Sequence, residues 1–322
     1  MSAAPSPLPF PIIYGATASG KSALALALHD LFQCRGHPSE LVTADAFQVY
    51  RGMDIGTAKP SAAERARVPH HVIDLMDPHG NEPFTAAQWL ARAEAAIAAC
   101  RARGVIPIVV GGTSLYIQSL LMGMFEGPPA DAALRAALTA LGAAARRAEL
   151  GRVDPAAALR IHASDERRTI RALEVFRLTG TPISTLQREW EQRAPRADAR
   201  PVILHRAPET LNPRINARVK TMFAAGLLDE VRALSAGAPL NRQAREALGY
   251  KQVLAHLERP RDITLDDACE RTKIETRRFA RNQRTWIKRI GALPGALRLD
   301  ADALDAEAMA TRVADSILTP AL

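Results

Sequence analysis

The sequence predicts an α/β protein whose parallel sheet is interrupted by an α-helical insertion and completed by further helices. Two patterns carry this prediction. Short apolar runs alternate with helical periodicity over residues 1–125, as in consecutive βα units. Residues 128–199 then show only helical patterns, before an apolar run at 201–205 returns to the sheet. We therefore expect a first part of the sheet domain at 8–127, a helical insertion domain at 128–200, and core completion with basic C-terminal helices at 201–322.

The individual elements follow from hydrophobic spacing. The apolar run at 106–110, IPIVV, is typical of a parallel strand buried on both faces. Thr85 is a suitable N-cap for the Ala-rich helix that follows it. Strands are expected at 10–14, 40–43, 72–75, 106–110 and 201–205. Helices are expected at 21–32, 85–103, 131–141, 143–150, 166–178, 182–192, 213–225, 245–257 and 265–290.

Composition limits the class of protein. Of the 322 residues, 48% are apolar, which is enough for a real core, and no run reaches the roughly 18 apolar residues of a membrane helix. The N-terminus lacks a basic region before its apolar stretch, so we interpret it as a short tail that enters the first strand, not a signal peptide. Cys34, Cys100 and Cys269 are too few and too scattered for a disulfide framework or a zinc site. A reducing, cytoplasmic setting is expected, with no membrane association.

Positive charge is concentrated in the second half of the chain. Residues 1–160 carry 14 basic and 13 acidic side chains, and residues 161–322 carry the other 28 basic and 21 acidic ones, so that +7 of the net +8 lies there. Such asymmetry favours a polyanionic partner, although an Arg-rich proteome gives a similar balance.

A phosphate-binding motif follows the first expected strand. Residues 15–22 read GATASGKS and match G-x-x-x-x-G-K-[ST]. A strand before the motif and a helix after it are what a P-loop needs, because its amide groups and the helix N-terminus together attract phosphate. The core is therefore expected to be P-loop NTPase-like. The predicted diphosphate-binding residues are Gly15, Ala16, Thr17, Ala18, Ser19, Gly20, Lys21 and Ser22, with Ser22 as a ligand of Mg²⁺. The motif does not fix the reaction, because kinases, NTPases and prenyl donors can share this loop.

Two polar residues are expected beside this loop. Asp45 stands where the second strand ends, and ligands of parallel sheets bind at the carboxyl ends of strands. Its carboxylate could accept a proton from a nucleophile, bind magnesium, or only cap a turn. Thr113 follows Gly111-Gly112 after the strand at 106–110, where it could contact a phosphate oxygen or act as an N-cap.

The helix expected at 265–290 has one basic face. At 100° per residue, Arg277, Arg281, Arg284 and Lys288 fall within roughly 60° of one another, and Phe279, Trp286 and Ile290 fall on the other side. No acidic residue occurs between Arg277 and Arg289. This favours a nucleic-acid contact over an ordinary solvated face, and it places Phe279 in the core.

The chain resembles the bacterial tRNA dimethylallyltransferases, also called isopentenyl-diphosphate:tRNA transferases. The likeness rests on blocks in the family's order, from residue 10 to about 290. They are GATASGKS at 15–22, DAFQVYRGMDIGTAKP at 45–60, GGTSLY at 111–116, IHASDERRTIRALEV at 161–175, GYKQ at 249–252 and RRFARNQRTWIKR at 277–289. MDIGTAKP and RALEV are more specific than the P-loop.

The resemblance implies a function and roles for particular residues. The reaction would be transfer of a dimethylallyl group from dimethylallyl diphosphate to the exocyclic amine of adenosine 37, beside the anticodon in the anticodon stem-loop of tRNA, with Mg²⁺ as cofactor. Asp45 matches the family's general base, and Thr113 and Arg135 match residues that assist at the reacting centre. The predicted tRNA-contacting residues, which include the basic helix face, are Asp45, Ala46, Phe47, Gln48, Arg167, Arg168, Thr169, Ile170, Arg171, Glu246, Ala247, Leu248, Gly249, Tyr250, Lys251, Arg277, Arg281, Asn282, Gln283, Arg284 and Lys288. A monomer without an obligate protein partner is expected.

Two positions depart from the family pattern, and three other functions remain to be weighed. Ala46 replaces the usual Ser after the catalytic Asp, and Ala16 replaces the usual Pro of the P-loop. A P-loop small-molecule kinase would need a second Asp at the end of a long apolar strand, which we do not find. A prenyltransferase acting on free adenine nucleotides would not need the basic second half or the helical insertion. A non-enzymatic RNA-binding protein would not need Asp45 beside an intact P-loop.

Overall fold

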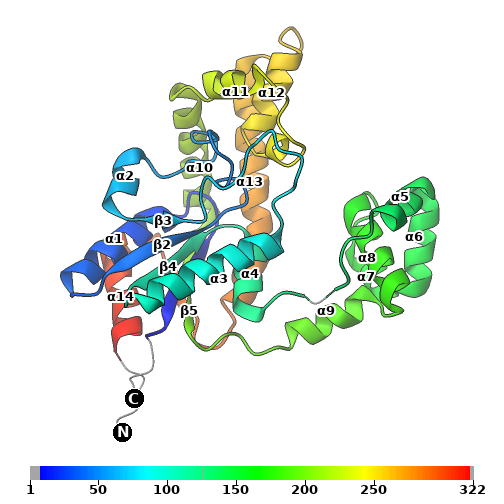
Figure 1. The fold of residues 1–322 in the computed structure, drawn as a ribbon. Helices are drawn as coiled ribbons and strands as arrows, with labels where there is room; N and C mark the ends of the chain where they lie inside the picture. Colours follow the sequence, from blue (N-terminus) through cyan, green and yellow to red (C-terminus); the bar gives the residue numbers. More distant parts are fainter. Residues whose placement is uncertain (1–7, 126, 320–322) are drawn as a thin grey trace. The chain divides into compact units, whose positions relative to one another are not determined.

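The computed structural model describes residues 8–125 and 127–319, and within these residues six parallel strands form one sheet in the order β3-β2-β4-β1-β5-β6. The tail expected before the first strand, residues 1–7, lies outside the described residues. Each strand is followed, directly or after a long connection, by a helix, as in other α/β folds (Figure 1). The strands are β1 (Phe10–Gly15), β2 (Ser39–Ala44), β3 (His70–His71), β4 (Ile106–Gly111), β5 (Ala199–His205) and β6 (Leu297–Asp300).

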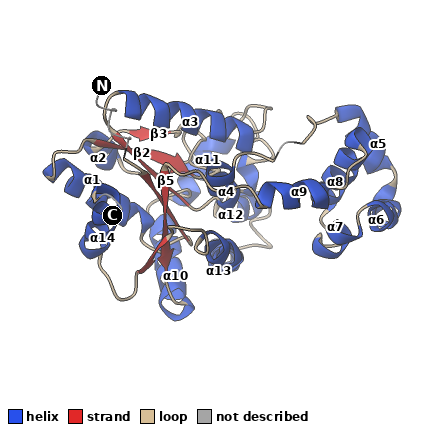
Figure 2. Cartoon of the chain, turned by 90° about the horizontal axis from the view of Figure 1, so that it is seen from below, coloured by secondary structure: helices blue, strands red, loops and turns tan. Residues whose placement is uncertain are grey.

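Helices cover both faces of this sheet (Figure 2). On one face α1 (Lys21–Cys34) packs against α14 (Ala306–Leu318), and their side chains form an apolar cluster with Ile13, Ile108 and Val202 of the sheet. The other face carries α3 (Ala86–Ala102) and α4 (Ser114–Met122), where Trp89 stacks on Tyr116 at 4.6 Å between ring centroids. Burial of both faces explains why the central strands are apolar throughout rather than alternating.

A group of helices that belongs to the same compact part of the chain as the sheet extends the fold beyond it (Figure 1). The long helix α13 (Leu265–Ile290) packs along α10 (Pro208–Ala224) and against α12 (Tyr250–Glu258). Helix α11 (Leu227–Ser235) contacts both α10 and α12. The short α2 (Ala62–Arg67) and a 3₁₀ turn at Ala244–Glu246 complete this part.

The chain divides into two compact units. The first comprises residues 1–120 and 196–322, and the second is Leu121–Pro195, whereas the insertion was predicted at 128–200. The second unit holds α5 (Ala132–Ala140), α6 (Gly142–Val153), α7 (Pro155–Arg160), α8 (Glu166–Thr179) and α9 (Ile183–Glu191). It has its own apolar cluster, in which Leu138, Leu150 and Leu173 are fully buried.

Several sequence predictions need correction. The third strand was expected at 72–75 but is only His70–His71, because Val72 and Asp74 have φ angles of 61° and 55°, which no strand accommodates. The helix expected at 245–257 is broken at Gly249, whose φ is 91°. Strand β6 and helix α14 were not predicted. Thr85 does cap α3, since its hydroxyl accepts a hydrogen bond from the Gln88 N–H at 3.2 Å.

None of the helices in the described part of the chain has the length and hydrophobicity to span a bilayer.

Candidate active site

The P-loop joins β1 to α1, and close contacts fix its backbone. A Cβ on Gly15 would lie 2.8 Å from Ser19 Oγ and 3.0 Å from the Leu204 carbonyl oxygen, so a side chain here would force the loop or its neighbours to shift. Gly20 has a φ of 107°, which side chains rarely allow. Lys21 Nζ donates to the Ala16 carbonyl oxygen at 2.7 Å, which folds the side chain back over the loop. The sequence motif therefore adopts a defined loop at the start of a helix, as predicted.

Cationic side chains gather over this loop. A cavity of about 340 Å³ is lined by Lys21 and Ser22 together with Arg214 and Arg218 of α10. The pKa of Lys21 is lowered to about 7, mainly by burial and also by the nearby positive charge of Arg218, while the negative charge of Asp45 partly opposes both. Burial also lowers the pKa of Arg218, again opposed by Asp45. One carboxylate thus faces two partly buried cations, and the cavity is suited to an anion that would supply the missing negative charge.

Asp45 comes directly after β2, at the carboxyl edge of the sheet. Its Oδ1 accepts hydrogen bonds from the N–H groups of Phe47, at 2.9 Å, and Gln48, at 3.3 Å. The next N–H, that of Ala46, donates to Thr113 Oγ1 at 3.0 Å. These bonds orient Asp45 through the backbone, without a hydroxyl at position 46. Thr113 is therefore a residue that joins the loops after β2 and β4.

A larger cavity of about 730 Å³ adjoins the P-loop within the first unit. It contains Lys21, Ser22, Asp45 and Thr113, so the structure brings together the residues that the sequence analysis predicted from separate motifs. The other predicted site residues that line it are Thr17, Ala46, Phe47, Gln48, Glu246, Ala247, Leu248, Asn282 and Gln283. Apolar side chains also line this cavity, among them those of Leu26, Leu41, Val110, Val219 and Met222.

The loop at 51–60, which contains the MDIGTAKP block, is held in place by one carboxylate of α11. Glu230 accepts hydrogen bonds from the backbone N–H groups of Asp54, Ile55 and Gly56, at 3.0, 2.8 and 3.3 Å, and from the hydroxyl of Tyr250. Tyr250 is fully buried, and a Cβ on Gly56 would clash with its ring. These hydrogen bonds from α11 fix the backbone of the loop, and the fixed loop forms one wall of the cavity.

Gln283 and Tyr250, which were predicted to contact tRNA, are buried and make contacts within the protein. Gln283 is buried, where its Oε1 accepts from the Thr17 N–H at 3.0 Å and its Nε2 donates to the Gly112 carbonyl oxygen at 2.7 Å. It therefore connects α13 to the P-loop and to the loop after β4. Gly249 and Tyr250 are buried as well, so their side of α12 packs inside the protein. Lys251 is exposed and pairs with Glu246 at 2.8 Å.

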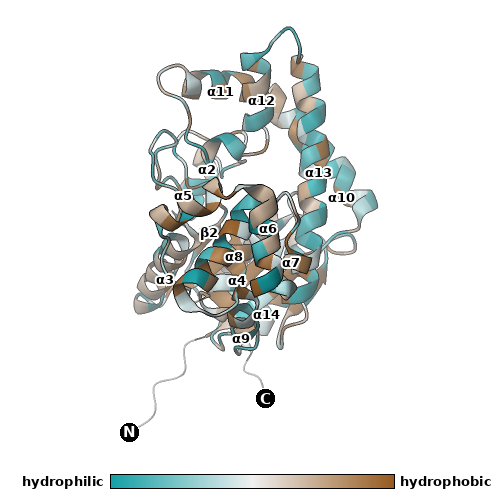
Figure 3. Ribbon diagram, turned by 90° about the vertical axis from the view of Figure 1, so that its right-hand side faces the viewer, coloured by the Kyte–Doolittle hydropathy of each residue, from teal (hydrophilic) through white to brown (hydrophobic). Residues whose placement is uncertain are grey.

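The predicted basic face of α13 is partly exposed, and its contact with tRNA stays a prediction. Figure 3 shows that the helix is predominantly hydrophilic along much of its length. Arg281 and Lys288 are exposed and Arg284 is partly buried, whereas Arg277 donates a hydrogen bond to Asn216 Oδ1. The prediction that Phe279 belongs to the core is wrong. Its side chain is 44% exposed and lines the larger cavity, because the helix here borders the cavity instead of packing on a neighbour.

The remaining predicted residues lie in the second unit. Arg135 Nε donates to Glu174 Oε1 at 2.8 Å, and Arg171 also pairs with this buried carboxylate, at 2.6 Å. Although burial alone would raise it, these two guanidinium groups and the Asp131 N–H hold the pKa of Glu174 down at about 2. Arg167 and Arg168 are exposed at the start of α8, Ile170 and Arg171 are partly buried, and Thr169 is buried.

The two arginines of α10 were not predicted from the sequence. Arg214 Nε donates to the Ala18 carbonyl oxygen at 3.1 Å, and Arg218 lines both cavities. A signal for them exists, because residues four apart on a helix share one face, and Arg214 and Arg218 have that spacing. Without the fold, however, nothing indicated that this face lies against the P-loop.

These observations define the class of protein. It is an α/β protein with a P-loop-like core, in which the cationic loop and the adjacent carboxylate line one cavity. The IPP transferase family model matches residues 48–290. A tRNA dimethylallyltransferase from Anaeromyxobacter sp. (strain K) is 46% identical over 282 residues, covering 86% of this chain and 89% of that protein. The chain belongs to the IPP transferase family.

Solved structures agree with this assignment. The tRNA isopentenylpyrophosphate transferase of Bacillus halodurans is 32% identical, covers 96% of both chains and superposes with a TM-score of 0.66. A eukaryotic dimethylallyltransferase, captured acting on tRNA, is 28% identical with a TM-score of 0.76 and covers 95% of this chain and 77% of its own. The fold predicted from the sequence is thereby confirmed.

Proposed function

We propose that this chain transfers a dimethylallyl group from dimethylallyl diphosphate to the exocyclic amine of adenosine 37 in tRNA and releases diphosphate. The observation that carries the proposal is the placement of Asp45 beside two cations, Lys21 and Arg218, in one cavity. A carboxylate at this point suits a nucleophile that must lose a proton, and the cations suit a leaving group that carries negative charge.

The donor fits the cavity at both of its ends. The diphosphate would lie on the P-loop amides beside Lys21, Arg214 and Arg218, where charge builds up as the carbon–oxygen bond breaks. The hydrocarbon would lie against the apolar part of the lining, to which Leu26, Val219 and Met222 contribute. The removal of one preorganised donor at such a site typically costs on the order of 10²–10³ in rate.

Magnesium fits the residues that line this cavity. The hydroxyl of Ser22 and the carboxylate of Asp45 line the same cavity and are oxygen donors, which Mg²⁺ prefers. When bound, the ion would neutralise part of the charge on the diphosphate. Ser22 would hold it, and the Asp45 carboxylate is then available to the acceptor amine.

The acceptor step follows from the position of Asp45. The exocyclic amine of adenosine is a weak nucleophile, because its lone pair is delocalised into the ring. Asp45 would accept a hydrogen bond from this amine and take its proton as the new carbon–nitrogen bond forms. The base must leave the stack of the anticodon loop to reach the cavity, which costs a few kcal/mol. Contacts from Arg281 and Lys288 of α13, and from Arg167 and Arg168 of α8, would offset that cost.

The other functions are less well supported. Strand β4, the neighbour of β1, ends at Gly111 and is followed by Gly112-Thr113, so it offers no acidic residue to a nucleotide-bound metal, which disfavours a kinase. A free nucleotide would leave the basic face of α13 without a role. A tRNA substrate also requires the compartment that contains tRNA, so we propose a cytoplasmic enzyme, active as a monomer.

The test is incubation with radiolabelled dimethylallyl diphosphate and Mg²⁺, in the presence of total tRNA, AMP or ATP. Label should enter the tRNA, and nuclease digestion should recover it on adenosine 37. Label found in AMP or ATP instead, or cleavage of ATP without transfer, would contradict the proposal.

A further inference from the structure

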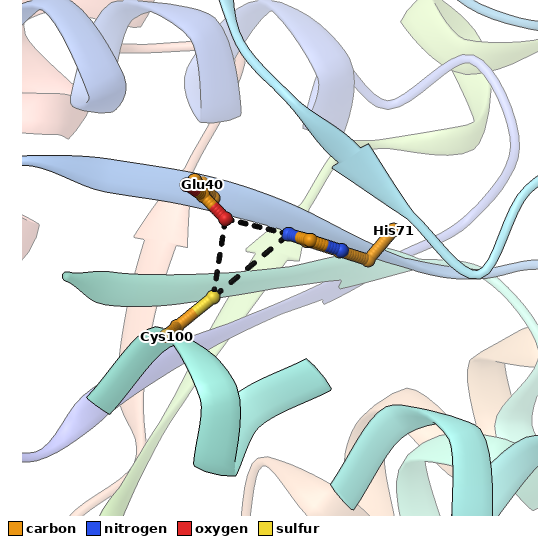
Figure 4. A group of neighbouring side chains, drawn as sticks. All are labelled: Glu40, His71 and Cys100. Carbon is orange, nitrogen blue, oxygen red and sulfur yellow. Dashed lines mark hydrogen bonds and ion pairs between the residues drawn. The ribbon is translucent and has the colours of Figure 1, made fainter. Parts of the chain in front are cut away.

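A second group of polar side chains lies near the start of β2, away from the P-loop. Glu40 of β2, His71 of β3 and Cys100 of α3 point toward one another (Figure 4). His71 Nε2 lies 2.6 Å from Glu40 Oε2, Cys100 Sγ lies 3.4 Å from the same oxygen, and Cys100 Sγ lies 3.9 Å from His71 Nε2. Three elements thus each place one metal-ligating atom around a common point.

The separations are close to those of a tetrahedral zinc site. Bonds of about 2.0 Å to oxygen and nitrogen and about 2.3 Å to sulfur, at tetrahedral angles, put the ligand atoms roughly 3.3–3.6 Å apart. The two distances from Cys100 Sγ already lie near this range, and only the His71–Glu40 pair has to separate slightly. The His71 side chain is 32% exposed and Cys100 is fully buried, so the imidazole is the side chain that can make this adjustment.

The surroundings supply the charge and the outer contacts that such a site needs. Arg103 donates to both oxygens of Glu40, to Oε1 at 2.8 Å and to Oε2 at 2.7 Å. Its side chain is half exposed, so it can release Oε2 and keep Oε1 as an outer-shell contact. The Arg103 guanidinium also holds the pKa of the Glu40 carboxyl down at about 2, so this ligand is ionised. A glutamate and a cysteine thiolate together balance the charge of a divalent cation.

We propose that Glu40, His71 and Cys100 form a binding site for one zinc-like transition-metal cation, with water as the fourth ligand on the exposed side of His71. Burial raises the pKa of the Cys100 thiol to about 11, so the thiol is protonated without metal. The metal would displace this proton to solvent as the metal–sulfur bond forms. In the described part of the chain no other group of three such ligands occurs. Cysteine spacing in the sequence argued against a zinc site, because spacing alone cannot show that a helix and two strands bring a glutamate and a histidine to Cys100.

The site is structural in this proposal, not catalytic. Glu40 and Asp45 are five residues apart on an extended strand and its end, or about 16 Å. The metal would connect β2, β3 and α3, and so support the short edge strand β3, which pairs with β2 only over Leu41–His70 and Val42–His71. Prenyl transfer should therefore not depend on it.

Cobalt is the probe, because thiolate ligation gives Co²⁺ a strong near-ultraviolet charge-transfer band. The full-length chain, free of any histidine tag and treated with chelator, is titrated with Co²⁺ and then with Zn²⁺. We expect one Co²⁺ per chain with the thiolate band, displacement by one equivalent of Zn²⁺, and a higher melting temperature with Zn²⁺. Cys100→Ser should lose the band, and His71→Gln should weaken binding at least 10-fold.

Matched controls separate this site from the other thiols and from the proposed active site. Cys34→Ser and Cys269→Ser should keep the band and the stoichiometry. Melting of each variant without metal shows whether it is folded, and transfer to tRNA should be unchanged in Cys100→Ser. The proposal is overturned if the folded wild type gives no thiolate band, or if Cys100→Ser keeps both the band and the Zn²⁺-dependent rise in melting temperature.

Discussion

Asp45 can be tested by a substitution that leaves its local structure in place. Asn retains the oxygen that accepts from the Phe47 and Gln48 N–H groups, but it cannot take a proton. Asp45→Asn should lower the rate of transfer by about 10²–10⁴ with little change in tRNA affinity. Single-turnover kinetics and a filter-binding assay measure the two effects. Turnover near that of the wild type would remove Asp45 from the role of base.

Lys21 makes donor binding depend on pH. Since its pKa is lowered to about 7 in the free protein, Lys21 is protonated below pH 7 and increasingly neutral above it. A bound diphosphate favours the charged form, so the protein must take up a proton to bind it at higher pH. Donor affinity should therefore fall as pH rises above about 7.

An arginine at position 21 provides the control, because guanidinium stays charged throughout this range. The difference in pH dependence between wild type and Lys21→Arg isolates Lys21 from the ionisation of the donor itself. Calorimetric titration with dimethylallyl diphosphate from pH 6 to pH 9 makes the comparison. Parallel profiles would contradict the assignment. In Lys21→Ala both affinity and turnover should fall at every pH.

Substitution of Phe279 tests whether its ring stacks on a base of the tRNA or packs in the core. Base–aromatic stacking contributes about 1–3 kcal/mol, so Phe279→Ala should weaken tRNA binding roughly 5- to 150-fold. Its melting temperature should stay near that of the wild type, because the ring is 44% exposed. Phe279→Trp should retain affinity. A large loss of stability, such as that expected for Phe32→Ala at a buried position, would show that Phe279 acts as a core residue instead.

At the scale of elements, the sequence predicts helices and strands where local signals dominate. The bounds 265–290 for α13 and the Thr85 cap of α3 were predicted correctly, since periodicity and capping are local. Strand β6 could not be predicted, because a four-residue edge strand gains its identity from pairing with β5. Likewise Phe279 lies on the apolar side by periodicity, and only the cavity beside α13 shows that this side is not covered there.

The same limit applies to the candidate site. The P-loop and Asp45 were predictable because each is marked by a motif at the end of a strand. Arg214 and Arg218 were not, since two arginines four residues apart do not show that their helix lies against the P-loop. Gln283 is the opposite case. It falls within a basic motif, but its burial and its bonds to Thr17 and Gly112 give it a positioning role.

The basic face of α13 predicts a measurable salt effect. Each phosphate contact adds a slope of about −0.9 on duplex and about −0.7 on single strands to log K against log salt. The double variant Arg281→Glu with Arg284→Glu should therefore bind tRNA more weakly and with a shallower slope, while diphosphate affinity is unchanged. Arg312→Glu on α14 is the control. Each single variant, Arg281→Glu or Arg284→Glu, should weaken tRNA binding more than this control does. Identical slopes and affinities in variant and wild type would mean that the face is only solvated.

At the scale of the whole molecule, we expect the first unit to bind the donor and the second unit to contribute to tRNA binding. The P-loop, Asp45 and both cavities lie in the first unit, and the second has its own core around Leu138 and Leu173. Replacement of residues 123–195 by a flexible linker should leave a folded protein that binds dimethylallyl diphosphate but has lost most of its affinity for tRNA. Circular dichroism, donor calorimetry and tRNA filter binding test the three parts of this statement.

A full-length variant tests the contribution of the second unit to tRNA binding even if the shortened chain does not fold. Arg167 and Arg168 are exposed at the start of α8, where Arg168 lies 3.5 Å from the partly exposed carboxylate of Asp165, whereas Arg135 and Arg171 both pair with the buried Glu174. Arg167→Glu with Arg168→Glu should therefore preserve the second unit and lower tRNA affinity and its salt dependence. Arg135→Gln would instead leave one partner fewer for the buried Glu174 and lower stability. If the Arg167–Arg168 variant bound tRNA like the wild type and transferred at the same rate, the helical unit would have no part in holding the substrate through this surface.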